Sequence, residues 1–201
     1  GADCLKLNVD FAHRHGMESF WSMRMNDTHD AAYRPDKPYL LYPPLKVEHP
    51  EWLVGEPIQR SPHGRWSSVD YARPEIRDLA FRYLEEVCRN YDVDGLELDY
   101  FRHLCYFKST AFGGAAVDAE RAMMTDFMRR VRTMTEDRGL ERGRPILVAI
   151  RVPDSVEFCR DMGFDLERWL EEGLVDMLVT TCYFRLNPWK YSVELGHRHG
   201  V

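Results

Sequence analysis

Residues 91–102 are Tyr-Asp-Val-Asp-Gly-Leu-Glu-Leu-Asp-Tyr-Phe-Arg, a segment that has the pattern of a turn followed by a short strand. A turn is predicted at residues 94–95, and apolar and acidic residues alternate from 96 to 99. Because successive side chains of a strand point to opposite faces, the two leucines share one face, and Glu97 and Asp99 share the other. We expect helices to cover the leucines and the acids to point into a barrel centre or cleft.

Two carboxylates aimed at one point, near the carboxyl end of a strand, are the usual layout of an active site in a (β/α)8 barrel. Asp99 lies nearest the strand end and is the first candidate for a catalytic carboxylate. Glu97 lies one pleat deeper and is either a second catalytic acid or a group that tunes Asp99 or holds a neighbouring arginine. Two alternatives remain open, an edge strand with its acidic face in water and an acidic pair held by buried arginines.

The chain has 201 residues, which is enough for one domain with a substantial core. The net charge of −6 and the lack of a basic stripe argue against a nucleic-acid partner. No apolar run approaches the ~18 residues that a membrane span needs. The five cysteines are spread out without a C-x-x-C pair, so a disulfide framework or a structural zinc site is not expected. We expect no cofactor and no resident metal.

Helical and strand patterns alternate along the chain. Helices are expected at 3–15, 74–90, 117–138, 165–172 and near the carboxyl terminus, and strands at 18–26, 96–100, 146–152 and 175–183. The alternation predicts an α/β fold with a parallel sheet, a partial (β/α)8 TIM barrel of about four βα units. Residues 1–201 are expected to form this single catalytic domain. Residues 27–73 are too long for an ordinary connection, so we expect a functional loop or lid over the active-site face.

The segment His13-Arg-His-Gly-Met17 is echoed by His197-Arg-His-Gly-Val201. A strand follows the first copy directly, and the second copy ends where a strand would begin. We therefore expect the chain to be a piece of an eight-fold barrel. Each H-x-H pair lies at the end of a predicted helix, where positive charge suits the helix dipole, so we interpret the pair in that way rather than as a metal site.

Polar and aromatic side chains gather at the predicted strand ends. The candidates for substrate binding are Arg24, Asn26, Asp27, His29, Tyr100, Arg102, Arg151, Asp154 and Tyr183. The arginines can bind a substrate carboxylate or pair with the strand acids, and the alternative is an internal lattice of salt bridges. Further aromatic residues are candidates for stacking on sugar faces: Trp21, Trp52, Trp66, Phe101 and Trp189.

Four segments together resemble the family-10-like glycoside hydrolases, TIM-barrel proteins of bacterial polysaccharide metabolism. The segments are Trp21–Asp27, Val69–Arg77, Tyr91–Arg102 and Trp169–Asp176. The resemblance covers most of residues 10–185 and implies a barrel that hydrolyses glycosidic bonds. The regions that would carry the first and last barrel strands of that family are missing, so a catalytic carboxylate on a late strand would lie outside this sequence.

Glycoside hydrolysis normally needs two carboxyl groups that flank the scissile bond. The predicted function is therefore a glycosidase acting on a poly- or oligosaccharide, with Asp99 central. One alternative is a carbohydrate-binding barrel without catalysis. The other is a metal-dependent barrel enzyme such as a lyase, with Asp27, Asp99 and Asp154 as oxygen ligands. The sequence gives no indication of an oligomeric state.

Overall fold

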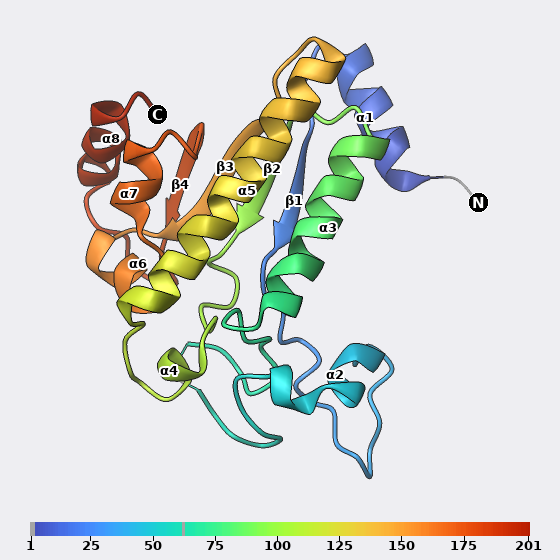
Figure 1. Ribbon diagram of the computed structural model, residues 1–201, viewed down its shortest axis with the longest axis vertical. Coiled ribbons are helices and arrows are strands. Elements are labelled where there is room, and N and C mark those ends of the chain that lie inside the picture. Colours follow the sequence, from blue (N-terminus) through green and yellow to red (C-terminus); the bar gives the residue numbers. More distant parts are fainter. Residues whose placement is uncertain (1–2, 62) are drawn as a thin grey trace.

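The computed structural model describes residues 3–61 and 63–201, which form a parallel sheet flanked by helices (Figure 1). The elements in chain order are α1 (Cys4–Arg14), β1 (Phe20–Arg24), α2 (Pro44–Glu48), the 3-10 helix η1 (Pro50–Trp52), α3 (Pro74–Asn90), β2 (Gly95–Asp99), α4 (Lys108–Ala111), α5 (Asp118–Arg142), β3 (Leu147–Pro153), α6 (Val156–Met162), α7 (Leu166–Glu171), β4 (Met177–Thr181) and α8 (Trp189–Arg198). Every described helix is too short or too polar to cross a bilayer.

The four strands lie in the order β1-β2-β3-β4, and each pair of neighbours is parallel. Consecutive strands are joined by helical connections, as in successive units of a (β/α)8 barrel. The predicted α/β fold, a partial TIM barrel of about four βα units, is confirmed. The register aligns Arg24 of β1 with Asp99 of β2, and Asp99 with Arg151 of β3.

The apolar core lies between the sheet and the helices. Helices α3 and α5 lie side by side across one face of the sheet (Figure 1), and Leu96 and Leu98 of β2 are completely buried there. Towards α7 the core becomes aromatic, because the rings of Tyr100, Phe164 and Trp169 are 5.0–6.0 Å apart. The Trp169 indole N–H donates to Thr125 Oγ1 of α5 at 3.0 Å, so the buried polar group is satisfied.

The structure differs from the expected elements in the second half of the chain. Helix α6 was not predicted, although Ser155 caps it by accepting the Phe158 N–H at 3.1 Å, and Gly163 ends it with φ of 99°. Strand β4 is shorter than expected and is not fully buried. Met177 and Val179 on its inner face are 46% and 37% exposed.

Residues 27–61 and 63–73 form a lobe beyond the carboxyl ends of the strands (Figure 1), called here the lobe of residues 27–73. The lobe has a small core of its own, made of Ala31, Tyr42, Leu53 and Trp66. A buried ion pair joins its two halves, with Lys46 Nζ 2.6 Å from Asp30 Oδ2, and Ser67 donates to the other Asp30 oxygen at 2.7 Å. Trp66 is only 4% exposed, so it is a core residue of this lobe and not a stacking platform for sugars.

Asp94 connects several elements at the opposite end of the sheet, where the strands begin. Its carboxylate accepts the Ser19 N–H at 2.7 Å, contacts His13 Nε2 of α1 at 2.8 Å, and pairs with Arg144 in front of β3. Burial raises the pKa of Asp94, but these hydrogen bonds and the Arg144 charge outweigh it, so the pKa lies below its ordinary value. One side chain therefore holds α1 and the starts of three strands together.

We predict that Asp94→Ala lowers the free energy of unfolding by about 2 kcal/mol or more, because it leaves the Ser19 N–H without its acceptor and removes one of the two carboxylates that pair with Arg144, the other being Asp92. Urea titration at neutral pH measures this loss. Because folding lowers the pKa of Asp94, its contribution is present above the unfolded-state pKa and is lost as the pH falls below about 4.

The difference in the free energy of unfolding between the wild type and Asp94→Ala should therefore become smaller as the pH is lowered. The control is Asp78→Asn, which breaks an exposed pair with Arg130 and should cost less than about 1 kcal/mol. Equal losses in the two variants would contradict the role of Asp94.

Candidate active site

The inner face of the sheet carries a row of charged side chains at the carboxyl ends of the strands. This charged row consists of Arg24, Asp99 and Arg151. Strand β2 alternates as predicted, with Leu96 and Leu98 under the helices and Glu97 and Asp99 on the opposite face. The register places Arg24 and Arg151 beside Asp99, one on each side. The three side chains share one face, because paired residues of neighbouring strands point the same way.

Asp99 is held by three donors. Its Oδ1 accepts the N–H groups of Phe101 and Arg102, both at 3.0 Å, and its Oδ2 lies 3.2 Å from Arg151 Nη1. The Asp99 side chain is 7% exposed and that of Arg151 is 36% exposed, so the pair lies at the boundary between core and solvent. The carboxylate is therefore fixed in position at the end of β2.

Glu97 lies deeper on the same face and has a different partner. Ser22 Oγ of β1 donates to Glu97 Oε1 at 2.6 Å. No arginine forms an ion pair with Glu97 within residues 3–61 and 63–201, so the expectation that Glu97 holds an arginine is not met. Glu97 is half-buried, whereas Asp99 is buried.

The loop after β1 places Asp27 and His29 next to Arg24. Asp27 Oδ2 is 2.9 Å from Arg24 Nη1, and Asp27 Oδ1 contacts both the backbone N and the ring Nδ1 of His29 at 2.8 and 2.7 Å. Burial raises the pKa of Asp27, but the His29 and Arg24 hydrogen bonds outweigh it and hold the pKa far below its ordinary value. Asp27 is therefore an anion across the physiological pH range.

Arg102 links this loop to Asp99. Its backbone N–H donates to Asp99, and its guanidinium Nη2 lies 3.2 Å from His29 Nε2. His103, the next residue, packs its ring edge-on against His29 with centroids 5.1 Å apart. Sequence reasoning missed His103, although it follows Arg102 directly and lies only four residues beyond the end of β2.

Asn26 acts as a clamp, meaning that its side chain forms hydrogen bonds to the backbone of two loops. This role differs from its predicted role in substrate binding. It is 2% exposed, and its amide nitrogen donates to the carbonyls of Val69 and Cys105 at 2.9 and 3.0 Å. Its Oδ1 accepts the Val69 N–H at 3.1 Å. The side chain is occupied by backbone groups, so it fixes the end of β1 to residues distant in sequence.

Tyr100 does not line the site. It is completely buried, and its hydroxyl points at Met128 Sδ of α5 at 3.2 Å. The reason is the alternation of β2 itself, which puts Tyr100 on the Leu98 face and not on the Asp99 face. The prediction that Tyr100 binds substrate is therefore wrong.

Tyr183 and Asp154 lie on the β3–β4 side of the site. The Tyr183 ring packs 4.7 Å from that of Phe101, and the tyrosine is 54% exposed, so it faces solvent beside Arg151. Asp154 is 6% exposed, and its carboxylate accepts the N–H of Asn187 in the loop before α8. Asp154 therefore holds a loop.

The ligand set of the metal-dependent alternative is not assembled. Asp27, Asp99 and Asp154 each have separate partners. Among the described residues, the group whose geometry could hold an ion is Asp27, His29 and His103.

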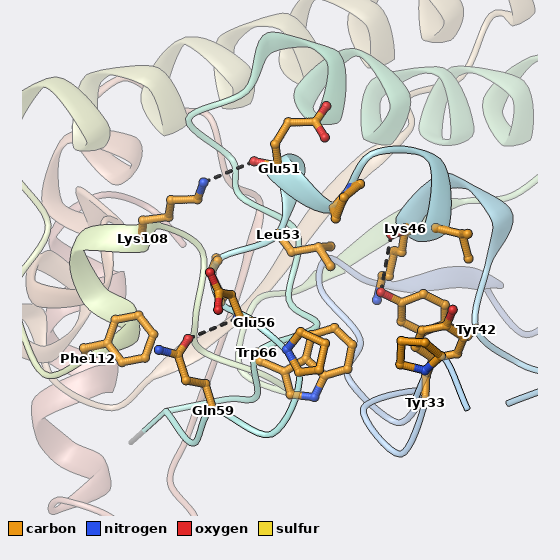
Figure 2. Close-up of a pocket in the computed structure, with 16 residues that line it drawn as sticks. Tyr33, Tyr42, Lys46, Glu51, Leu53, Glu56, Gln59, Trp66, Lys108 and Phe112 are labelled. Atoms are coloured by element: carbon orange, nitrogen blue, oxygen red, sulfur yellow. Dashed lines mark hydrogen bonds between the residues drawn. The ribbon is translucent and has the colours of Figure 1, made fainter. Parts of the chain in front are cut away.

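Two cavities of about 610–700 Å³ are lined by residues of the lobe. One, of about 700 Å³, is lined by Arg24, Asp27 and His29 together with lobe residues, so it leads to the charged row. The other, of about 610 Å³, lies between the lobe and α4 (Figure 2). Figure 2 shows Lys108 bonded to the Glu51 carbonyl and the rings of Tyr33 and Tyr42 stacked on one side. The residues that contact Asp99 do not line this second cavity.

Among the other aromatic candidates for sugar stacking, Trp189 is 76% exposed at the start of α8. Trp52 is stacked on His49 with ring centroids 3.8 Å apart. Trp21 is partly buried against the main core, and Phe101 is 3% exposed beneath Tyr183. Of this set, Trp189 alone offers a largely open ring.

No protein-family model and no curated protein matches the sequence. Solved structures do match the fold. A proposed sporulation-specific glycosylase from Bacillus subtilis superposes with a TM-score of 0.53 and 11% identity, covering 99% of this chain and 54% of that one. An α-galactosidase of family GH36 from Geobacillus stearothermophilus, solved with raffinose, gives 0.51 and 15%, covering 97% and 24%. An α-galactosidase from Lactobacillus brevis gives 0.50 and 14%, covering 98% and 23%.

The likeness to these proteins establishes the fold. The chain spans between about a quarter and about half of their lengths. At identities of 11–15%, the agreement reflects the order and packing of helices and strands and not shared site residues.

We predict that Asn26→Ala lowers the free energy of unfolding by about 2–3 kcal/mol, because it leaves the buried Cys105 carbonyl and the partly buried Val69 carbonyl and N–H without this partner. Chemical denaturation followed by circular dichroism measures the change. Asn8→Ala, on the exposed surface of α1, is the matched control and should change stability by less than about 0.5 kcal/mol. If Asn26→Ala leaves the free energy of unfolding unchanged, the Asn26 hydrogen bonds do not support the site.

Proposed function

We propose that this chain is the catalytic part of a glycoside hydrolase that acts on a poly- or oligosaccharide. The observation that carries the proposal is the fixed Asp99 carboxylate, which lies between two arginines at the carboxyl end of a barrel strand. Active sites of (β/α)8 barrels lie at this end of the strands. Carboxylates in such positions are the groups that glycosidic hydrolysis requires.

Asp99 has the features of a nucleophile or of an anion that stabilises a positively charged transition state. Its three donors position the oxygens and require no movement during the reaction. Glu97 is the second acid on the same face, with a neutral hydroxyl as its partner. By the strand rise, the two residues are separated by about 6.6 Å along β2, which falls between the spacings typical of retaining and inverting enzymes. We assign Glu97 to proton transfer or to the support of Asp99.

The surrounding side chains fit sugar recognition. Arg24 and Arg102, whose guanidinium groups contact Asp27 and His29, can donate to hydroxyl or carboxylate oxygens of a sugar. Tyr183 is exposed next to Arg151 and offers an aromatic face. The cavity of about 700 Å³ next to Asp27 has room for saccharide units. In this proposal the lobe of residues 27–73 forms one wall of the substrate cleft.

The solved structures support the same class of reaction. Those that share the fold include α-galactosidases and a proposed glycosylase, and one of them was solved with raffinose. A fold alone does not fix chemistry, because barrels host many reactions. The residue geometry at Asp99 is therefore the part of the proposal to be tested.

We predict that Asp99→Asn lowers kcat/KM for glycoside hydrolysis by about 10³-fold or more, because the amide keeps the shape but loses the negative charge. The measurement is a rate assay with a panel of aryl glycosides and polysaccharides. Asp78→Asn on α3 is the control and should leave the rate unchanged. Glu97→Gln should reduce the rate less than Asp99→Asn if it acts in support.

An Asp99→Asn variant that is as active as the wild type would refute the assignment. If the wild type binds sugars but hydrolyses none of the panel, the site belongs to a carbohydrate-binding barrel. Unfolding curves for each variant separate a loss of chemistry from a loss of structure.

A further inference from the structure

We propose that Asp27, His29 and His103 form a binding site for a divalent transition-metal ion, with the donor set suited to zinc. A carboxylate oxygen of Asp27 and one ring nitrogen from each histidine lie within 4.8 Å of one another. The three residues come from the loops that follow two neighbouring strands, β1 and β2. Parallel pairing thus brings a local Asp-x-His pair and a distant histidine to one point.

Asp27 and His29 are placed so that both can bind one metal ion. Asp27 Oδ1 and His29 Nδ1 are 2.7 Å apart, so they now share a proton, and a metal ion can take the place of that proton. The two ligands are separated by one residue, Thr28, which is completely buried and whose carbonyl accepts the Ala31 N–H at 3.1 Å. Binding would therefore need only a small widening of an existing contact.

His103 supplies the third ligand, and its orientation suits the task. Its Nδ1 lies 3.3 Å from the Asn26 carbonyl oxygen, which can only accept, so Nδ1 carries the proton and Nε2 carries the lone pair. Metal-bound histidines usually donate their other ring N–H to a carbonyl or carboxylate in this way. The Asn26 side chain is itself clamped to Val69 and Cys105, which fixes the support.

The donor set identifies the class of ion. Two imidazole nitrogens and one carboxylate oxygen suit zinc and related transition metals and not calcium or magnesium, which prefer oxygen ligands. Three protein ligands leave one position of a tetrahedral zinc open. The adjoining cavity of about 700 Å³ is lined by Asp27 and His29 and gives an ion and a fourth ligand access.

Two arginines already contact the proposed ligands, and an ion would have to bind in their presence. Arg24 pairs with Asp27 Oδ2 and leaves Oδ1 to His29. Arg102 donates to His29 Nε2 at 3.2 Å, which requires that nitrogen to be unprotonated. Metal binding at Nδ1 moves the proton to Nε2 and breaks this contact. Arg102 is exposed and can turn into solvent, so it acts as a competitor and not as a block.

This inference does not depend on the proposed glycosidase activity. The ion would fix the loops after β1 and β2 to each other, and Arg102 connects those loops to Asp99. Metal binding is measured directly, so an inactive protein that binds zinc, or an active one that does not, separates the two proposals.

The test is isothermal titration of the chelator-treated full chain with Zn²⁺, together with the visible absorption of added Co²⁺ as a report on tetrahedral nitrogen and oxygen ligation. We expect one ion per chain. His29→Gln and His103→Gln should each weaken Zn²⁺ binding by at least about tenfold. Arg102→Gln should strengthen it, because the competing cation is removed.

His49→Gln is the matched control. His49 also contacts a carboxylate two residues away, with Nδ1 3.2 Å from Glu51 Oε1, but this pair belongs to no three-ligand group among the residues that the structure describes. The His49→Gln affinity should equal that of the wild type. Thermal unfolding by circular dichroism shows that each variant is folded.

Three results would each overturn the site: no stoichiometric binding by the wild type, equal affinity in His103→Gln, or weaker binding in Arg102→Gln.

Discussion

Strand β2 lies in the middle of the sheet, and the strict alternation of its side chains determines how the sheet packs and where the site lies. Leu96 and Leu98 can be buried under α3 and α5 only if Glu97 and Asp99 face the other side. A slip of one residue would bury two carboxylates in the apolar core, at a cost of several kcal/mol for each unpaired charge. Hydrophobic burial thus fixes both the register and the position of Asp99.

The charged groups at the two ends of the strands have different roles. At the amino-terminal edge, Asp94 joins α1, β1 and the start of β3 in a network whose groups satisfy one another. At the carboxyl edge, Arg24, Asp99 and Arg151 lie in a row next to a cavity. Charge at the first edge supports the fold, and charge at the second is presented to solvent, where binding and catalysis take place in barrels.

The sequence predicted those parts that depend on local pattern, namely the helix at Pro74–Asn90, the alternation of β2 and the parallel α/β fold. It did not predict contacts between distant loops. Asn26 became a clamp because Val69 and Cys105 come to it in space, and the site gained His103 through the packing of one loop on another. The error at Tyr100 was avoidable, since the alternation that places Asp99 inward places Tyr100 outward.

In the proposed function, the charged row around Asp99 binds saccharides, and the cavity between the lobe and α4 does not. Side-chain NMR spectra of the isotope-labelled chain, recorded while oligosaccharides are added, test it most directly. We expect saturable shifts of the Arg102 and Arg151 guanidinium signals, with the Gln59 amide of the other cavity unchanged. Shifts at Gln59 without any at Arg102 and Arg151 would mean that saccharides bind in the cavity between the lobe and α4 and not at Asp99.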